Sequence, residues 1–181
     1  AVGDDGTILT SSDGMNFVAM ESPTTRTLYD VYYNDVTFIA TGANGTILTS
    51  TDGTSWTSRT SGTTYSIRSI AFNENTNEFL AVGNEGLMIK SSNLQTWTII
   101  PSLAYLTLNS VIYNDNLNLF VIVGDYGTII TGLDEFTRTT LNQEKEIMFI
   151  GFIKEYSHMF IGGAGILYSS SNAEDWSNIL N

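Results

Sequence analysis

VGDDGTILTSSDGMNF, at residues 2–17, is the first of five stretches in this chain that align over sixteen residues without a gap. The other four are TGANGTILTSTDGTSW (41–56), VGNEGLMIKSSNLQTW (82–97), VGDYGTIITGLDEFTR (123–138) and IGGAGILYSSSNAEDW (161–176). Their starts lie about 40 residues apart. A period of this length, carried by short apolar runs with Gly and Asx-Gly turns between them, is typical of propeller blades.

The second unit shows how one blade is built. Apolar or β-branched runs at 28–33, 37–41, 46–50 and 55–59 are separated by turn residues, which predicts four strands and three tight hairpins. We therefore predict an all-β fold, a five-bladed propeller of four-stranded antiparallel blades. The first unit begins at the end of its second strand, so its blade is incomplete, and we expect the chain to be a piece of a longer protein. Further blades beyond this chain are the alternative. The predicted blades are 1–22, 23–60, 61–101, 102–141 and 142–181.

Composition limits the classes of partner. The chain has 181 residues, enough for one domain with a real core, and 42% of them are hydrophobic. Its net charge of −12 would repel a phosphate backbone or an anionic membrane surface, which argues against nucleic acid and membrane partners. No apolar run is long enough to span a bilayer. The absence of cysteine excludes disulfides but leaves the cellular compartment open.

Three features recur in each unit and have structural interpretations. Paired glycines such as Gly42 and Gly45 suit a tight turn that needs a positive φ. An acidic or amide residue in the next hairpin can accept backbone N–H bonds and hold that turn. An aromatic residue four positions later is expected to pack over the turn rather than to form a carbohydrate platform. The acidic or amide residues are Asp13, Asp52, Asn93, Asp134 and Asn172, and the aromatic residues are Phe17, Trp56, Trp97 and Trp176.

The motif Ser-x-Asp-Gly-x-x-Trp after a Gly-x-x-Gly hairpin resembles the Asp-box repeat of bacterial neuraminidases. The longer form is similar to repeats of photosystem II assembly-factor propellers and of propellers in phage tail receptor-binding proteins. The chain departs from the usual Asp-box because Trp follows Asp by four residues, and the fourth unit has Gly132 and Arg138 in place of the Ser and the aromatic residue. The resemblance to phage proteins implies host attachment from the virion surface, outside the cell.

An enzymatic role has little support in the sequence. A sialidase needs three converging arginines, a Tyr–Glu nucleophile pair and an Asp acid/base, and of the four arginines here only Arg68 falls on a predicted innermost strand. His158 is the single histidine and has no triad context. We predict no enzyme and no cofactor. The metal site that composition leaves open is an oxygen-ligand calcium site, whose carboxylates would be Asp4, Asp5, Glu85 and Asp125.

A ligand site should lie where the repeats differ. Near the start of the innermost strands the units carry Tyr29, Arg68, Asn109 and Met148, beside linkers that also differ. We predict ligand contacts at Tyr29, Arg68 and Asn109, together with linker residues Arg26, Tyr65 and Tyr105. Such side chains suit a sugar, and with the resemblance they favour a cell-surface glycan or wall glycopolymer, with other tail or baseplate chains as neighbours. The alternative is a protein-interaction scaffold like the assembly-factor propellers.

Overall fold

The computed structural model describes residues 1–141 and 145–180. Its strands form five antiparallel sheets in chain order, the first with two strands and the other four with four strands each. The predicted start and end of the fifth blade, Asn142 and Asn181, lie outside the described residues. Each helical segment in the described ranges is a three-residue 3-10 turn, and none could cross a membrane.

The element bounds follow the repeat. The first sheet has η1 (Asp4–Gly6), β1 (Ile8–Thr10) and β2 (Val18–Met20). The second has β3 (Leu28–Tyr33), β4 (Phe38–Gly42), η2 (Ala43–Gly45), β5 (Thr46–Ser50) and β6 (Thr57–Thr60). The third has β7 (Ile67–Asn73), β8 (Glu78–Gly83), η3 (Asn84–Gly86), β9 (Met88–Ser91) and β10 (Thr98–Ile99). The fourth has β11 (Leu108–Asn114), β12 (Leu119–Gly124), η4 (Asp125–Gly127), β13 (Thr128–Gly132) and β14 (Phe136–Thr140). The fifth has β15 (Ile147–Ile153), η5 (Lys154–Tyr156), β16 (His158–Gly163), β17 (Ile166–Ser170) and β18 (Ser177–Asn178).

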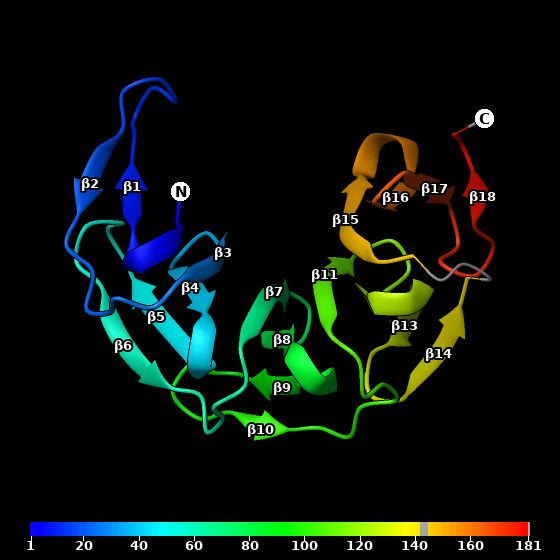
Figure 1. The fold of residues 1–181 in the computed structure, drawn as a ribbon, viewed down its shortest axis with the longest axis horizontal. Helices are drawn as coiled ribbons and strands as arrows, with labels where there is room; N and C mark the ends of the chain where they lie inside the picture. The colour runs from blue at the N-terminus through cyan, green and yellow to red at the C-terminus, as the bar shows by residue number, and fades with distance from the viewer. Residues whose placement is uncertain (142–144, 181) are drawn as a thin grey trace.

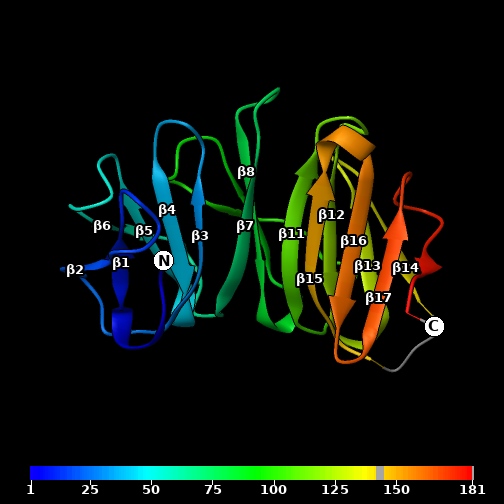
Figure 2. The same ribbon diagram turned by 90° about the horizontal axis from the view of Figure 1, so that it is seen from above.

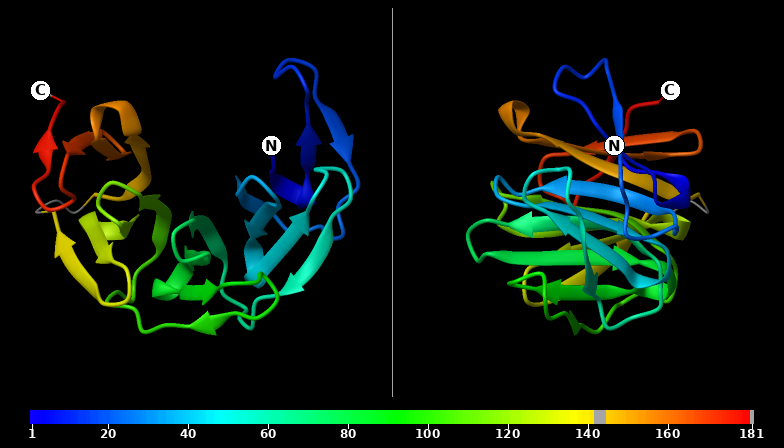
Figure 3. Two further views of the ribbon diagram at one scale, coloured as in Figure 1. Left: turned by 180° about the vertical axis from the view of Figure 1, so that it is seen from behind. Right: turned by 90° about the vertical axis from the view of Figure 1, so that its left-hand side faces the viewer.

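The sheets stand side by side around an arc. Strands β3, β7, β11 and β15 lie on its concave side and β6, β10, β14 and β18 on its outer side (Figure 1). The arc is open between the two-stranded first sheet and the fifth sheet, where both chain ends lie (Figures 1 and 3). Seen from above, the inner strands run alongside one another (Figure 2). This arrangement confirms the predicted propeller of antiparallel blades with an incomplete first blade.

The core lies between the blades rather than within any one of them. Four apolar clusters fill the interfaces between successive sheets, and the middle strand β8 contributes residues to two of them. Phe79 and Ala81 belong to the cluster shared with the second sheet, whereas Leu80 and Val82 belong to the cluster shared with the fourth. Because successive strand residues point to opposite faces, a strand buried on both sides must be apolar without alternation.

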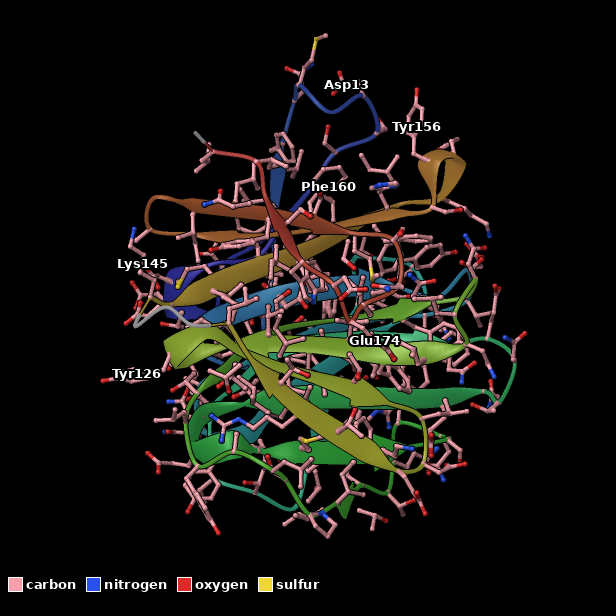
Figure 4. The ribbon with its side chains drawn as sticks, turned by 90° about the vertical axis from the view of Figure 1, so that its right-hand side faces the viewer. Asp13, Tyr126, Lys145, Tyr156, Phe160 and Glu174 are labelled. Carbon is pink, nitrogen blue, oxygen red and sulfur yellow. The ribbon has the colours of Figure 1, made fainter. Side chains whose placement is uncertain are left out.

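The Gly-x-x-Gly segments form the 3-10 turns η1 to η4 on one edge of the blades. In η2 both Asn44 (φ 54°) and Gly45 (φ 69°) are left-handed. A Cβ on Gly45 would lie 2.0 Å from the carbonyl oxygen of Thr63, because the linker to the next blade packs directly on this glycine. Tyr126 of η4 and the linker residue Lys145 lie at this edge in the fourth and fifth blades, and Tyr156 lies at the opposite edge (Figure 4).

The Asp-box hairpins close as an Asx turn in four of the five units. The Asp52 carboxylate accepts the N–H groups of Thr54 and Ser55 at 2.8 and 2.7 Å. The Ser50 hydroxyl donates to the same carboxylate and accepts from the N–H of Gly53. Equivalent acceptor roles fall to Asp13, Asn93 and Asn172.

The fourth unit corrects the prediction made for Asp134. With Gly132 replacing the serine, Gly132 and Phe136 pair directly and the hairpin needs no Asx side chain. The Asp134 side chain is exposed instead, 3.9 Å from Lys90 Nζ of the neighbouring sheet.

The tryptophans fold over these turns. Indole Nε1 of Trp56 donates to the Gly53 carbonyl at 3.2 Å, and that of Trp176 to the Ala173 carbonyl at 3.3 Å. Trp56, Trp97 and Trp176 each pack against an inter-blade cluster, which is the packing role proposed from the sequence. Phe17 in the first unit is 51% exposed.

Gly45→Ala should destabilise the domain strongly, because it combines left-handed strain with a collision against the Thr63 carbonyl. We expect a loss of about 3 kcal/mol or more in the free energy of unfolding, measured by urea denaturation. Gly14→Ala is the matched control, since Gly14 has a similar φ of 73° but no atom within 4 Å of the position that a Cβ would occupy, and it should cost about 1 kcal/mol. Equal losses in the two variants would contradict the close linker contact.

Asp52 should contribute stability that acid removes. Its pKa lies well below the usual value because the N–H groups of Ser55 and Thr54 hydrogen-bond the charged form. The stabilisation is therefore complete above about pH 4, the unfolded-state pKa, and is lost as the pH falls further. Asp52→Asn should flatten the decline of the melting temperature between about pH 4 and pH 2. The reverse change, Asn93→Asp, should steepen it; a parallel profile in both variants would show that the turn carboxylate has no such role.

Candidate functional site

The residues that differ between repeats occupy a special backbone position. Each innermost strand has a register shift after its first residue, so that Tyr29, Arg68, Asn109 and Met148 are left out of the pairing with the second strand. Each is the extra residue of a β-bulge, a feature that re-aims a side chain. We call these four residues the rim.

A close backbone contact accompanies the bulges on the second, third and fourth blades. Ala43, Asn84 and Asp125, the first residues of η2 to η4, donate their N–H groups to the carbonyls of Thr27, Ser66 and Thr107 at 2.9 to 3.0 Å. The glycine before each donor permits this contact; a Cβ on Gly83 would lie 1.9 Å from the Ser66 carbonyl oxygen. The repeated glycine therefore fixes where each inner strand begins, and the bulge residue is free to vary.

Arg68 and Tyr29 form the polar part of the rim. Arg68 Nε donates to Asn84 Oδ1 at 2.8 Å, and its guanidinium carbon lies 5.6 Å from the centroid of the Tyr29 ring. Within the described residues, the ion pairs involve only Lys90 and Lys154, so no carboxylate neutralises Arg68 there. Its remaining N–H groups can bind an anionic or carbonyl oxygen.

Asn109 and Met148 continue the rim with different chemistry. The Asn109 amide donates to Asp125 Oδ1 at 2.9 Å and to the Ile147 carbonyl at 3.0 Å, which joins the fourth and fifth blades. Met148 is 47% exposed and the following Phe149 is 50% exposed. The rim thus changes from cationic and aromatic on the second and third blades to apolar on the fifth.

Next to the rim, side chains tie neighbouring inner strands together, an arrangement that the sequence did not reveal. Asp30 Oδ2 accepts the N–H of Ile70 at 3.1 Å, and Ser69 Oγ accepts the N–H of Val111 at 3.3 Å. Burial raises the pKa of Asp30 above its ordinary value, against the hydrogen bonds that its carboxylate accepts from the Ile70 N–H, the Ser69 hydroxyl and the Val31 N–H. The only signal in the sequence was an acidic residue inside an otherwise apolar strand.

The predicted linker residues do not join the rim contacts described above. Arg26 Nη1 donates to the Asn44 carbonyl at 3.3 Å, and Arg26 lines a shallow hollow of about 610 Å³ between its linker and the second blade. Tyr65, 52% exposed, lines a hollow of about 600 Å³ that lies between the second blade, the linker to the third blade and Ile99. Tyr105 is 90% exposed on the next linker.

The groups considered for catalysis or metal binding are dispersed. Arg59 donates to Thr49 Oγ1, and Arg138 donates to the Leu103 carbonyl, so the four arginines have partners at four different places. His158 Nδ1 lies 2.7 Å from the Tyr156 carbonyl on an exposed hairpin. Among the residues that the structure describes, no three His, Cys, Asp or Glu side chains come together as metal ligands. Asp4 is instead an acceptor for the Thr27 hydroxyl.

Comparison with solved structures shows the fold that the geometry indicates. A structure titled "YCF48 bound to D1 peptide" superimposes with a TM-score of 0.70 at 14% identity, covering 98% of this chain and 61% of that one. A second, "Crystal structure of Nidogen/Laminin Complex", gives 0.75 at 10% identity, covering 100% and 76%. Both are β-propellers, and this chain spans less than two thirds of the YCF48 chain. No protein-family model and no curated protein matches the sequence.

Asp30→Asn should change the pH dependence of stability in the direction opposite to Asp52→Asn. Because the folded-state pKa of Asp30 is raised, its ionisation destabilises the fold as pH rises above about 4, the unfolded-state value. The asparagine keeps an acceptor for the Ile70 N–H, so the variant should gain melting temperature relative to the parent between about pH 4 and pH 7. Asp30→Ala, which leaves that N–H without its acceptor, should lose about 1–3 kcal/mol near pH 4, where Asp30 is protonated in the folded parent. An Asn variant that lost as much would contradict the assignment.

Proposed function

We propose that this chain is a non-catalytic interaction module that binds an extended segment of a protein partner along the rim. The observation that carries the proposal is the set of four bulges at the start of the inner strands. On the second to fifth blades these bulges present four different side chains at equivalent positions. Side chains that pack the frame recur from blade to blade, whereas the rim does not repeat. A row of varying side chains at one level of a repeated frame is what a binding surface on a repeat scaffold requires.

The chemistry of the rim fits a peptide that is acidic at one end and apolar at the other. Arg68 offers a guanidinium without a carboxylate partner among the described residues, beside the exposed ring of Tyr29. Arg and Tyr are enriched at protein interfaces, and the apolar end at Met148 and Phe149 gives adaptable contact area. The amide of Asn109 lies between these ends in chain order and already bonds Asp125 and Ile147, so it acts as a spacer.

The two solved propellers support a proteinaceous partner. Their titles name a D1 peptide in one case and laminin in the other. At 10% and 14% identity they share only the fold with this chain, so the partner proposed here rests on the rim itself.

A cell-surface glycan or wall glycopolymer is the second candidate. The observation that favours it is the pair of hydroxyl-rich hollows lined by Arg26 and by Tyr65. Under this candidate the chain works on a virion surface as part of a tail receptor-binding protein, as its resemblance to such repeats implies, with tail or baseplate chains as neighbours.

Selection from a displayed library of random twelve-residue peptides tests the first proposal. We expect enrichment of peptides that combine acidic and apolar residues, and Arg68→Ala should weaken a selected peptide about tenfold, or about 1.4 kcal/mol, with an unchanged melting temperature. Arg138→Ala is the matched control, because Arg138 lies on the outer strand β14 and should not affect binding. Peptides whose affinity Arg68→Ala leaves unchanged, or a blank selection beside a glycan array with strong hits, would overturn the proposal.

A further inference from the structure

The turn between the second and third strands has one backbone shape in the first four blades. The second residue of each 3-10 turn, η1 to η4, is left-handed, with φ between 53° and 56°. These residues are Asp5, Asn44, Glu85 and Tyr126. Asparagine and aspartate enter this region readily, because their short polar side chains can bond the local backbone, whereas a bulky side chain is strained there. The frame therefore sets the conformation, and Tyr126 adopts it at a cost in stability.

The other non-glycine residues with a positive φ have a local explanation. Four lie in hairpins between first and second strands and are short and polar: Asp35, Asn77, Asn118 and Ser157. Leu94 and Ala173 lie in Asp-box hairpins and are buried in inter-blade clusters. Glu85 is exposed and charged, as surface carboxylates ordinarily are. None of these explanations applies to Tyr126.

The Tyr126 side chain makes no contact within the described residues that would offset the strain. It is 58% exposed and belongs to none of the four apolar clusters. In that part of the chain it also has no hydrogen bond and no ring contact. Strained backbone positions of this kind persist where the side chain has a function, so the outlier points to a contact outside the chain.

Tyr126 lies directly beside the rim. Asp125, the residue before it, accepts the amide of the rim residue Asn109 at 2.9 Å. Gly127, the residue after it, donates its N–H to the carbonyl of the linker residue Lys145 at 2.9 Å. Tyr126 and Lys145 lie at the same edge of the blades (Figure 4). The ring therefore belongs to the fourth blade, between Arg68 on the third blade and the apolar end of the rim on the fifth.

We propose that Tyr126 is a specificity-determining contact for the peptide that binds along the rim. The inference rests on the proposed function and adds a determinant at the centre of the rim, where the Asn109 amide is already bonded within the fold. Tyrosine offers a large apolar ring with a polar tip, and it is enriched at protein interfaces. The ring would pack against a large apolar side chain in the middle of the peptide, between its acidic residue and its apolar end.

Tyr126→Asn separates binding from stability, because it relieves the backbone strain and removes the ring. We expect the melting temperature to rise by about 2 °C or more. The affinity for a twelve-residue peptide selected on the parent should fall about tenfold, as measured by titration calorimetry. A residue with a merely structural role would not give opposite changes in the two measurements.

Two matched variants test the two parts of this argument. Tyr126→Phe keeps the ring and should bind the same peptide within about twofold of the parent. Asn44→Tyr places a tyrosine on the equivalent turn of the second blade, where φ is 54°, and should lower the melting temperature by about 2 °C or more. In a double-mutant cycle, replacing the large central side chain of the peptide by alanine should weaken binding to the parent but not weaken it further in Tyr126→Asn.

The outcomes distinguish this inference from the proposed function. If Arg68→Ala weakens the peptide and Tyr126→Asn does not, the role of Tyr126 is overturned and the rim proposal stands. A peptide that neither variant weakens would overturn both. A lower melting temperature in Tyr126→Asn would contradict the strain at this turn. A parent that self-associates in solution, with Tyr126→Asn monomeric, would assign the ring to a second copy of the chain and overturn the peptide contact.

Discussion

The structure depends on apolar contact between neighbouring sheets, because a single sheet of this kind would expose its apolar faces to water. Each middle strand is buried on both faces, as the alternate membership of Phe79 and Leu80 in two clusters demonstrates. Burial of this kind contributes roughly 25 cal/mol for each Å² of apolar surface removed from water, and it is available only when neighbouring blades stand side by side. The repeat is therefore a requirement of the core, and most positions that recur are positions that face another blade.

The same constraint explains why diversity is confined to a few places. The inner strand must begin close to the turn glycine, since a Cβ on Gly83 would lie only 1.9 Å from the Ser66 carbonyl oxygen. The bulge then accommodates one residue that is left out of the strand pairing. That residue can change from Tyr29 to Met148 at little cost to the frame. Linkers have similar freedom once their contact with the turn is made. Variation at the rim and in the linkers is thus a consequence of how the frame is built.

The sequence alone predicts the architecture well because its signals are local. Turn glycines, the Asx residues and the strand lengths are each read within one unit, and the four rim positions stand out because four inner strands can be aligned. Contacts between blades join residues about 40 positions apart, which no local pattern reports. The bonds from Asp30 to Ile70 and from Ser69 to Val111 therefore have no counterpart among the sequence predictions. The prediction for Asp134 is wrong for a related reason, since the single change to Gly132 alters the hairpin pairing. The sequence groups Arg26 and Tyr65 with the rim residues because they are close to them along the chain. Closeness along the chain does not show which side of a linker a side chain lies on.

The strongly negative charge has a consequence for binding at the rim. An acidic ligand that approaches a chain of net charge −12 is repelled before it makes contact. At physiological salt this repulsion extends over a Debye length of about 8 Å. Attraction can arise only at short range, from a guanidinium group such as that of Arg68, which lacks a carboxylate partner among the described residues. The association rate and the affinity for a single site are then low. Selectivity is high, because a ligand that lacks the correct anionic group makes no favourable contact with the guanidinium. Useful affinity in such a system comes from several copies acting together, since linked sites raise the effective concentration without any new contact. A repeat scaffold that presents one such rim per chain is suited to that mode of recognition.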